Sequence, residues 1–435
     1  MEQDTGKDAG AVRLRVAERS QVVTERLDDL LATEHPARTI WEITGALDLS
    51  AFCEPIRARQ GVVGRNSTDP RLLTAVWLYA TVRGVGAARE LDRLCRESRP
   101  YQWLCGGVSV NYHLLSDFRV RHAGALDQLF TQVVAVLVKK GLVTVRRIAQ
   151  DGLRVRASAG ASSFRRGSTL ERLQEEAAEH VRQLRQLLED PKKSAGLSVR
   201  VKQARRRAAR ERQERIAQAK QLIPQLQERQ RRSAQRLSQK QQVEQQREPR
   251  ASTTDAEVAR MKMSNGGFNP AVNVQLAGDP QSRAILGVGV TSEGVDYEQS
   301  EPMRQQVEER TGQKVEEHLY DGGYTKTEQI ERAAEAGVTV YAPPKPPRNR
   351  EKRGDEFTPR SGDSEAIRQW RARMGSDAGQ QIYKQRGATI ETINARMRRS
   401  GLTQLTVRGL RKIRCVVLWA ALAYDLTLLA QAWIA

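Results

Sequence analysis

The sequence predicts a mixed protein of the α+β or α/β class, in which a helical N-terminal domain precedes a sheet domain that a long helical segment interrupts. In the first third of the chain, apolar residues recur at helical spacing. After this first third, the chain contains short β-branched runs that end at turn residues. Between two groups of such runs, residues 168–250 are dominated by Glu, Gln and Arg and carry an apolar repeat of helical period.

The first part of the chain is predicted to be a polar leading segment, residues 1–37, and then a helical domain, residues 38–142. Asp69 and Pro70 mark a helix start, because Asp caps an N-terminus and Pro fits the first helical position. Short helices joined by tight turns are typical of helix-turn-helix DNA readers, and helical bundles of no particular function show the same pattern. The pattern alone therefore leaves both interpretations open.

The sheet domain is predicted to comprise residues 143–167 and 251–435, with residues 168–250 as a charged helical arm inserted after the first strand. Pro191 and Pro224 are expected to divide this arm into about three helices, because proline breaks a helix interior. The later part of the arm is too polar for a buried helix. It fits an arm that lies along DNA, one that contacts a second subunit, or a solvated hairpin.

Two predicted strands each lead to a carboxylate. A β-branched run, residues 143–148, leads to a strand end at Asp151, and residues 315–320 form a short strand that ends at Asp321. Glycine follows both acids, so each also suits a tight turn with no further role. Strand-like runs on either side of a Gly-Asp-Pro turn predict a hairpin over residues 271–291.

The stretch 383–398 is predicted to be a helix, because its apolar residues recur at roughly helical spacing. It carries Tyr383, Arg386, Glu391 and Arg398. A carboxylate flanked by a phenol and guanidinium groups suits a metal ligand beside a phosphate-binding group, since hard cations take oxygen ligands and Arg binds phosphate with two hydrogen bonds. A solvent-exposed charged helix would show the same residues.

Composition favours a nucleic-acid partner. Lys and Arg total 72 against 52 Asp and Glu, which gives a formal net charge of +20 at pH 7. Such a charge attracts polyanions, nucleic acid first and an anionic membrane second. No membrane role is expected, because the N-terminus is polar and the apolar run 415–435 carries Asp425 near its middle, which favours a buried core helix. Four cysteines without C-x-x-C spacing predict reduced thiols in a cytoplasmic protein.

The pattern Tyr-x-x-Arg-x4-Glu-x6-Arg over residues 383–398 resembles the third catalytic motif of DDE transposases of bacterial insertion sequences, in which Lys usually stands where this chain has Arg398. The resemblance extends over nearly the whole chain from about Arg38 onward. Further blocks are similar to the same family in the same order, at residues 151–160, 252–255, 261–270, 321–324 and 407–415. The resemblance implies a ribonuclease-H-like catalytic domain, preceded by a helical domain that binds DNA or supports catalysis.

The resemblance also implies the site. Asp151, Asp321 and Glu391 would converge to hold Mg²⁺, with Mn²⁺ as a substitute, because clustered carboxylates repel one another unless a cation neutralises them. Two ions about 4 Å apart would activate the attacking oxygen and stabilise the leaving one.

The same resemblance implies the partners and the reaction. Tyr383, Arg386 and Arg398 would bind phosphates of double-stranded DNA. The expected reaction is hydrolysis at the ends of a mobile element, followed by transfer of the freed 3′ ends into target DNA. Joining two ends suggests a homodimer on DNA, in the cytoplasm at the nucleoid.

Several alternatives remain at this level. Asp255, Asp296 and Asp425 are competing acids, and they rank lower because none ends a predicted strand of the right order. In a tyrosine recombinase, Tyr383 would attack DNA with support from Arg386 and without a divalent metal. A non-catalytic basic DNA-binding protein, or a transposase copy whose catalysis has decayed, would also carry the +20 charge.

Overall fold

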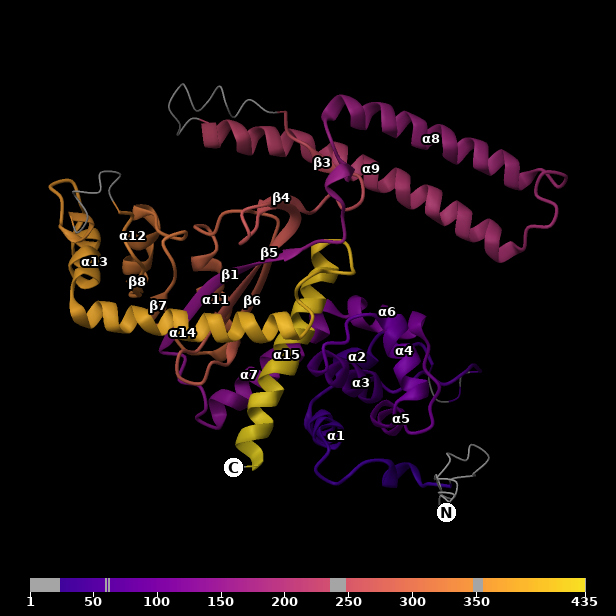
Figure 1. Cartoon of the computed structure of the whole chain (residues 1–435), viewed down its shortest axis with the longest axis horizontal. Coiled ribbons are helices and arrows are strands. Elements are labelled where there is room, and N and C mark those ends of the chain that lie inside the picture. The colour runs from indigo at the N-terminus through magenta and orange to yellow at the C-terminus, as the bar shows by residue number, and fades with distance from the viewer. Residues whose placement is uncertain (1–23, 59–60, 62, 235–247, 347–354, 435) are drawn as a thin grey trace, which may run out of the picture.

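The protein has a mixed α+β architecture with a helical N-terminal region and a mixed sheet, as predicted (Figure 1). The computed structural model describes residues 24–434 except 59–60, 62, 235–247 and 347–354. Most of the leading segment 1–37 therefore lies outside the described residues.

The helical region surrounds one almost fully buried helix, α3. Its start is the predicted one: the Arg71 N–H donates to the Asp69 side chain at 2.7 Å, and Pro70 takes the first helical position. Eleven of its 13 residues are buried, and the Trp77 indole donates to the Leu115 carbonyl at 3.0 Å. The helices are α1 (Pro36–Ala46), α2 (Ser50–Cys53), α3 (Pro70–Val82), α4 (Ala88–Glu97), α5 (Arg99–Cys105), α6 (Tyr112–Arg121) and α7 (Ala123–Lys139).

The sheet contains six strands. β5 pairs antiparallel with β1 on one side and with β6 and β4 on the other, whereas β1, β7 and β8 run parallel. The predicted hairpin is the β5–β6 pair. The strands are β1 (Arg147–Arg156), β4 (Ala259–Lys262), β5 (Phe268–Gly278), β6 (Ile285–Thr291), β7 (Glu317–Leu319) and β8 (Thr339–Tyr341).

The prediction that Asp151 ends the first strand is wrong. β1 continues to Arg156 because β5 pairs with it along residues 149–156. β7 pairs with β1 only as far as Ala149, so Asp151 lies just beyond the point where one edge of β1 becomes free. Asp151 therefore lies in the middle of β1, just after the point where the pairing of β1 with β7 has ended.

Helices cover both faces of the sheet. α11 (Ser300–Thr311) packs on one face, where Gly287 leaves room for Met303, and α14 (Asp377–Arg399) packs on the other, where Gly278 leaves room for Ile393. A side chain at either glycine would clash with the covering helix. α12 (Thr327–Glu335) links β7 to β8, and α13 (Glu365–Gly375) precedes α14.

The charged segment forms a hairpin of two long helices that projects from the sheet (Figure 1). These are α8 (Gly167–Glu189) and α9 (Val199–Ala234), which share a small apolar cluster, and a two-strand ladder of β2 (Phe164–Arg165) with β3 (Ala251–Ser252) lies at their base. The predicted helix break at Pro224 is wrong, because α9 runs through it. Proline removes one backbone hydrogen bond, and the packing of Ile216 and Ile223 against α8 holds the helix together.

The apolar C-terminal run is the predicted core helix, α15 (Leu410–Ile434). Its stretch Leu410–Ala430 is long and apolar enough to cross a membrane, yet 78% of the tested window is buried inside the fold against α3, α7 and β6. Asp425 accepts a hydrogen bond from the Ile285 N–H at 2.9 Å, and complete burial raises the pKa of its carboxyl well above the usual value.

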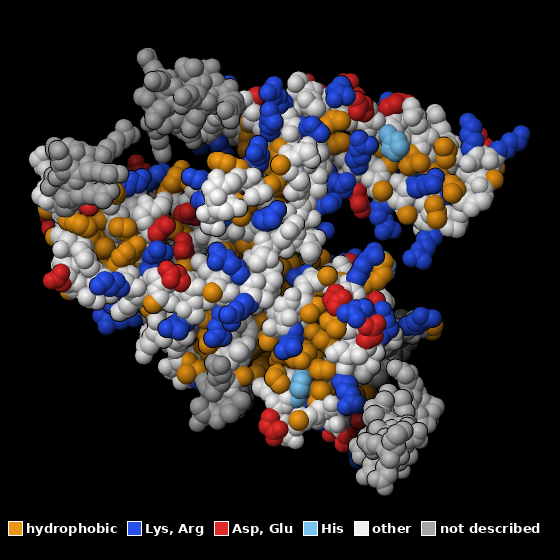
Figure 2. Space-filling model, viewed as in Figure 1, with side chains coloured by type: hydrophobic (Ala, Val, Ile, Leu, Met, Phe, Trp, Pro, Cys, Tyr) orange, Lys and Arg blue, Asp and Glu red, His pale blue; other side chains and the backbone are white. Residues whose placement is uncertain are grey.

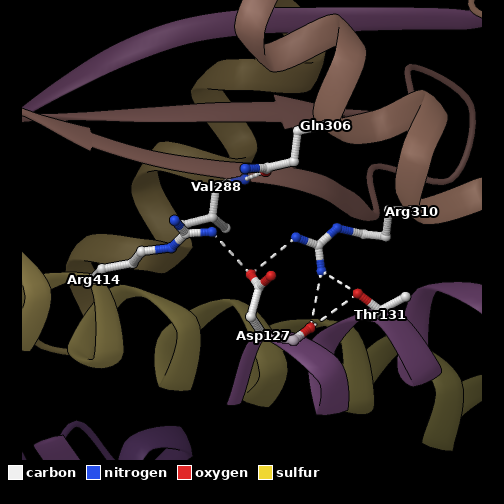
Figure 3. Close-up of polar contacts among 6 residues, drawn as sticks. All are labelled: Asp127, Thr131, Val288, Gln306, Arg310 and Arg414. Carbon is white, nitrogen blue, oxygen red and sulfur yellow. Dashed lines mark hydrogen bonds and ion pairs between the residues drawn. The ribbon is translucent and has the colours of Figure 1, made fainter. Parts of the chain in front are cut away.

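One carboxylate joins the N-terminal helices to the sheet. Asp127 on α7 lies between two guanidinium groups, Arg310 of α11 at 3.1 Å and Arg414 of α15 at 3.0 Å (Figure 3). Arg310 also donates to the Thr131 hydroxyl at 2.8 Å, and burial lowers the pKa of this guanidinium while Asp127 opposes the shift. Asp127 thus ties three elements that are far apart in the sequence.

We expect Asp127→Ala to lower the free energy of unfolding by about 2–4 kcal/mol, because the buried Arg310 loses its ion-pair partner. Urea unfolding measures the change. The matched control is Asp117→Ala, which breaks only the exposed pair with Arg121 and should cost no more than about 0.5 kcal/mol. Equal effects of the two substitutions would contradict the role assigned to Asp127.

Candidate active site

The open edge of β1 is where two acidic residues meet. β7 ends at Leu319, and the chain turns through Asp321 and two glycines before Tyr324. Since the carboxyl ends of neighbouring parallel strands lie at the same edge, this turn places Asp321 beside Asp151. The Gly323 N–H donates to Asp321 Oδ1 at 2.8 Å and fixes the orientation of that carboxylate.

Asp151 is half-buried on the face of the sheet that α14 covers. Burial raises the pKa of its carboxyl, and the neighbouring Asp321 and Asp296 raise it further. Arg386, whose Nη1 lies 3.4 Å from Asp151 Oδ2, and the Gly152 N–H, which donates at 2.8 Å, oppose this shift. Burial is the largest of these effects, so the pKa of the Asp151 carboxyl stays above its usual value despite the contact with Arg386.

A third acid, Asp296, reaches the same edge from the loop between β6 and α11. Its Oδ1 accepts hydrogen bonds from Asn273 at 2.6 Å and from Gln275 at 2.8 Å. A Cβ atom on Gly152 would lie 2.7 Å from this oxygen, and one on Gly323 would lie 2.8 Å from Asp321 Oδ1 and 3.6 Å from Asp296 Oδ2. Bare Gly323 therefore lets Asp296 lie close to Asp321, whereas bare Gly152 makes room for Asp296 on the face of β1 opposite to Asp151, because neighbouring strand residues point to opposite faces.

Asp296 ends no predicted strand, and no spacing in the chain indicates its position. The other two competing acids are structural. Asp255 accepts the Gly409 N–H at 2.9 Å, and Asp425 accepts a backbone N–H inside the core. The low rank of Asp255 and Asp425 agrees with these contacts, whereas Asp296 belongs to the cluster.

A buried amide network supports Asp296 from inside the sheet. Gln150 donates to Gln275 Oε1 at 2.9 Å, and the Tyr324 hydroxyl donates to the same oxygen. Burial and the three nearby carboxylates raise the pKa of Tyr324 well above its usual value. Within the described part of the chain, the fully buried oxygens Gln150 Oε1 and Asn273 Oδ1 have no hydrogen-bond donor. Carboxylates and spare amide oxygens are the donor set of a hard cation.

α14 brings two of the predicted phosphate-binding residues to the same edge. Arg386 contacts Asp151, and its guanidinium carbon lies 5.8 Å from the centre of the Tyr383 ring. Burial raises the pKa of Tyr383, Arg386 lowers it, and Asp321 and Asp151 raise it again. The net shift is upward, so the phenol keeps its proton at neutral pH.

The remaining two predicted residues lie on the exposed side of α14. A carboxylate oxygen of Glu391 turns back along the helix, 3.8 Å from the position of a Cβ on Gly387, which follows Arg386. Among the residues that the structure describes, no three His, Cys, Asp or Glu side chains are arranged to hold a metal ion. Arg398 is exposed twelve residues after Arg386, roughly 18 Å further along the helix.

The structure thus brings together Asp151, Asp321, Tyr383 and Arg386, and adds Asp296 to them. Glu391 and Arg398 lie outside this group in the conformation observed. Carboxylates suit divalent cations, and guanidinium and phenol groups suit phosphate diesters, whereas in this conformation the described acids do not surround a common metal position.

Two family models match the chain. Residues 25–121, which span α1 to α6, match a transposase domain (DUF772). Residues 344–430 match a transposase DDE domain, and this match contains α14 with Tyr383, Arg386 and Glu391. No curated protein and no solved structure matches the chain.

Proposed function

This chain belongs to the DDE transposases of insertion sequences, and we propose that it binds the ends of a mobile DNA element, cleaves them by metal-dependent hydrolysis and joins the 3′ ends to target DNA. One observation carries this proposal. Asp151 and Asp321 lie side by side at the open edge of β1, next to Arg386 from the segment that matches the DDE domain.

The proposed catalytic domain is ribonuclease-H-like and consists of residues 143–167 and 251–435. The support is the strand sequence β6-β5-β1-β7-β8, in which an antiparallel half adjoins a parallel half through β1. The arm, residues 168–250, is inserted in the chain after β1 and β2 and before β3, β4 and β5. Residues 38–142 form the proposed DNA-binding or supporting domain.

Asp151 and Asp321 are the proposed metal ligands, and Glu391 supplies the third carboxylate when α14 binds DNA. Burial and the neighbouring carboxylates raise the pKa of Asp151, and a bound cation would favour its charged form, which supports the proposed ligand role. Oxygen donors favour Mg²⁺, with Mn²⁺ as a substitute. When bound, such a cation activates the attacking water or 3′-hydroxyl and stabilises the leaving oxygen.

The side chains of α14 are proposed to hold the DNA. Arg386 is shared between Asp151 and a scissile-strand phosphate, since guanidinium binds either oxyanion with charge-assisted hydrogen bonds. The protonated phenol of Tyr383 donates to a neighbouring phosphate oxygen. Arg398, further along the helix, contacts the backbone several nucleotides away. Two element ends must be joined, which favours a homodimer on double-stranded DNA, at the nucleoid.

The test is cleavage of a labelled element end with and without Mg²⁺, with the break mapped to a nucleotide. We expect a hydrolytic 3′-hydroxyl end that forms only with Mg²⁺ or Mn²⁺.

Tyr383→Phe should slow cleavage by no more than about tenfold, because it removes one hydrogen bond to a phosphate. A covalent adduct on Tyr383, or full cleavage in EDTA, would favour a tyrosine recombinase. Binding without any cleavage would favour a non-catalytic DNA-binding protein.

A further inference from the structure

The two helices of the arm carry opposite charge. α9 has twelve Lys and Arg residues and three Glu residues, whereas α8 has three Arg residues and five Glu residues. The positive charge of the arm is therefore concentrated on one helix. Figure 1 shows that α9 lies on the side of the hairpin toward the N-terminal helices, and Figure 2 shows Lys and Arg side chains along that edge of the arm.

The arginines of the two helices also differ in their partners. Each arginine of α8 pairs with a glutamate about one turn away on the same helix, at 2.5–2.9 Å: Arg172 with Glu176, Arg182 with Glu179, and Arg185 with Glu189. In the first half of α9, by contrast, six exposed arginines have no ion pair or side-chain hydrogen bond within the described part of the chain. They are Arg200, Arg205, Arg206, Arg207, Arg210 and Arg212, and they are called here the arginine run.

The length of the arginine run suits a nucleic-acid duplex. From Arg200 to Arg212 the helix advances about 18 Å at roughly 1.5 Å per residue. Duplex DNA presents one negative charge per about 1.7 Å of axis, so this stretch faces roughly ten phosphates. Neighbouring guanidinium groups repel one another, and a helix that was only solvated would gain from glutamates of the kind that α8 places one turn away.

We propose that the arginine run of α9 binds the phosphate backbone of duplex DNA without sequence preference, away from the cleavage site. This inference rests on the proposed function. A second copy of this chain is the weaker partner, because the formal net charge of +20 offers few acidic surfaces to six arginines. The arginine run lies in the half of α9 nearer the tip of the hairpin, whereas Ala219 and Ile223 in the later half share an apolar cluster with Ala251 of β3 at the base.

Salt dependence of DNA binding tests the proposal. The test variant is R205Q/R206Q/R207Q, and the matched control is R172Q/R182Q/R185Q on α8, which removes the same charge from paired arginines. Glutamine keeps helix propensity, so circular dichroism should be unchanged in both. For a duplex of arbitrary sequence, the slope of log Kd against log salt should fall by about 0.9 to 2.7 in the test variant, since each phosphate contact contributes about 0.9 and consecutive helix residues do not share one face. The control should keep the wild-type slope.

An unchanged slope in the α9 variant, with salt-dependent binding by the wild-type protein, would overturn this inference and leave the proposed function standing. Equal losses in the two variants would overturn it as well, because bulk charge would then explain the effect. Loss of a DNA-free dimer in the α9 variant, seen by sedimentation, would assign the arginine run to a second subunit instead. Failure of the wild-type protein to bind DNA would refute the proposed function itself.

Discussion

Replacing Asp151 or Asp321 by asparagine should slow DNA cleavage at least about 1000-fold while the affinity for element ends stays within about threefold of wild type. Asparagine keeps the shape of the side chain but removes the charge that binds a divalent cation, and the loss of metal activation alone is worth several kcal/mol at the transition state. Binding survives because phosphate contacts come from Arg and Lys side chains elsewhere on the protein.

Single-turnover cleavage and gel-shift binding measure the two quantities separately. The control is Asp425→Asn, which changes a buried acid of the same domain whose pKa is raised by burial, and asparagine can accept the Ile285 N–H as the acid does. This variant should cleave at nearly the wild-type rate. Residual cleavage in Asp151→Asn together with lost binding would contradict the proposed site.

Glu391→Gln should slow cleavage by about 100- to 1000-fold, and this is the second large effect. Glu391 is exposed on α14 in the DNA-free structure, with its carboxylate turned back toward Gly387, next to the arginine that contacts Asp151. The proposal therefore requires Glu391 to approach the two aspartates when DNA and metal bind. Glu365→Gln, on α13, changes an exposed acid paired with Arg368 and should leave cleavage unaffected.

Asp296→Asn, measured beside Glu391→Gln, decides which residue is the third acid. Asparagine retains an oxygen that accepts from Asn273 and Gln275, so the amide network can persist. If Asp296 only supports the aspartates, cleavage should fall by about tenfold. A larger loss for Asp296→Asn than for Glu391→Gln would contradict the assignment of Glu391 and make Asp296 the third ligand.

Local patterns were sufficient for the elements that depend on local chemistry. The helix start at Asp69 and Pro70, the β5–β6 hairpin and the core helix α15 all follow from capping, turn and hydrophobic patterns within a few residues. The helix that carries Tyr383 and Arg386 was predicted in the same way, from the spacing of its apolar residues.

Long-range contacts explain what the patterns missed. The end of β1 depends on how far β5 pairs with it, and residues 157–267 separate the two strands. Pro224 stays helical because α8 packs beside it, which propensity cannot indicate. The place of Asp296 depends on the amides Asn273 and Gln275 and on bare glycines of other segments, so no spacing within its own loop reveals it.

The most direct measurement is the anomalous signal of Mn²⁺ in a crystal of the protein with a DNA end that lacks the attacking hydroxyl. We expect a peak within about 2.5 Å of carboxylate oxygens of both Asp151 and Asp321, with Glu391 moved in to complete the site and Arg386 on a phosphate. A peak that touches only one of the two aspartates, or Mn²⁺ bound elsewhere while DNA fills the site, would contradict this expectation.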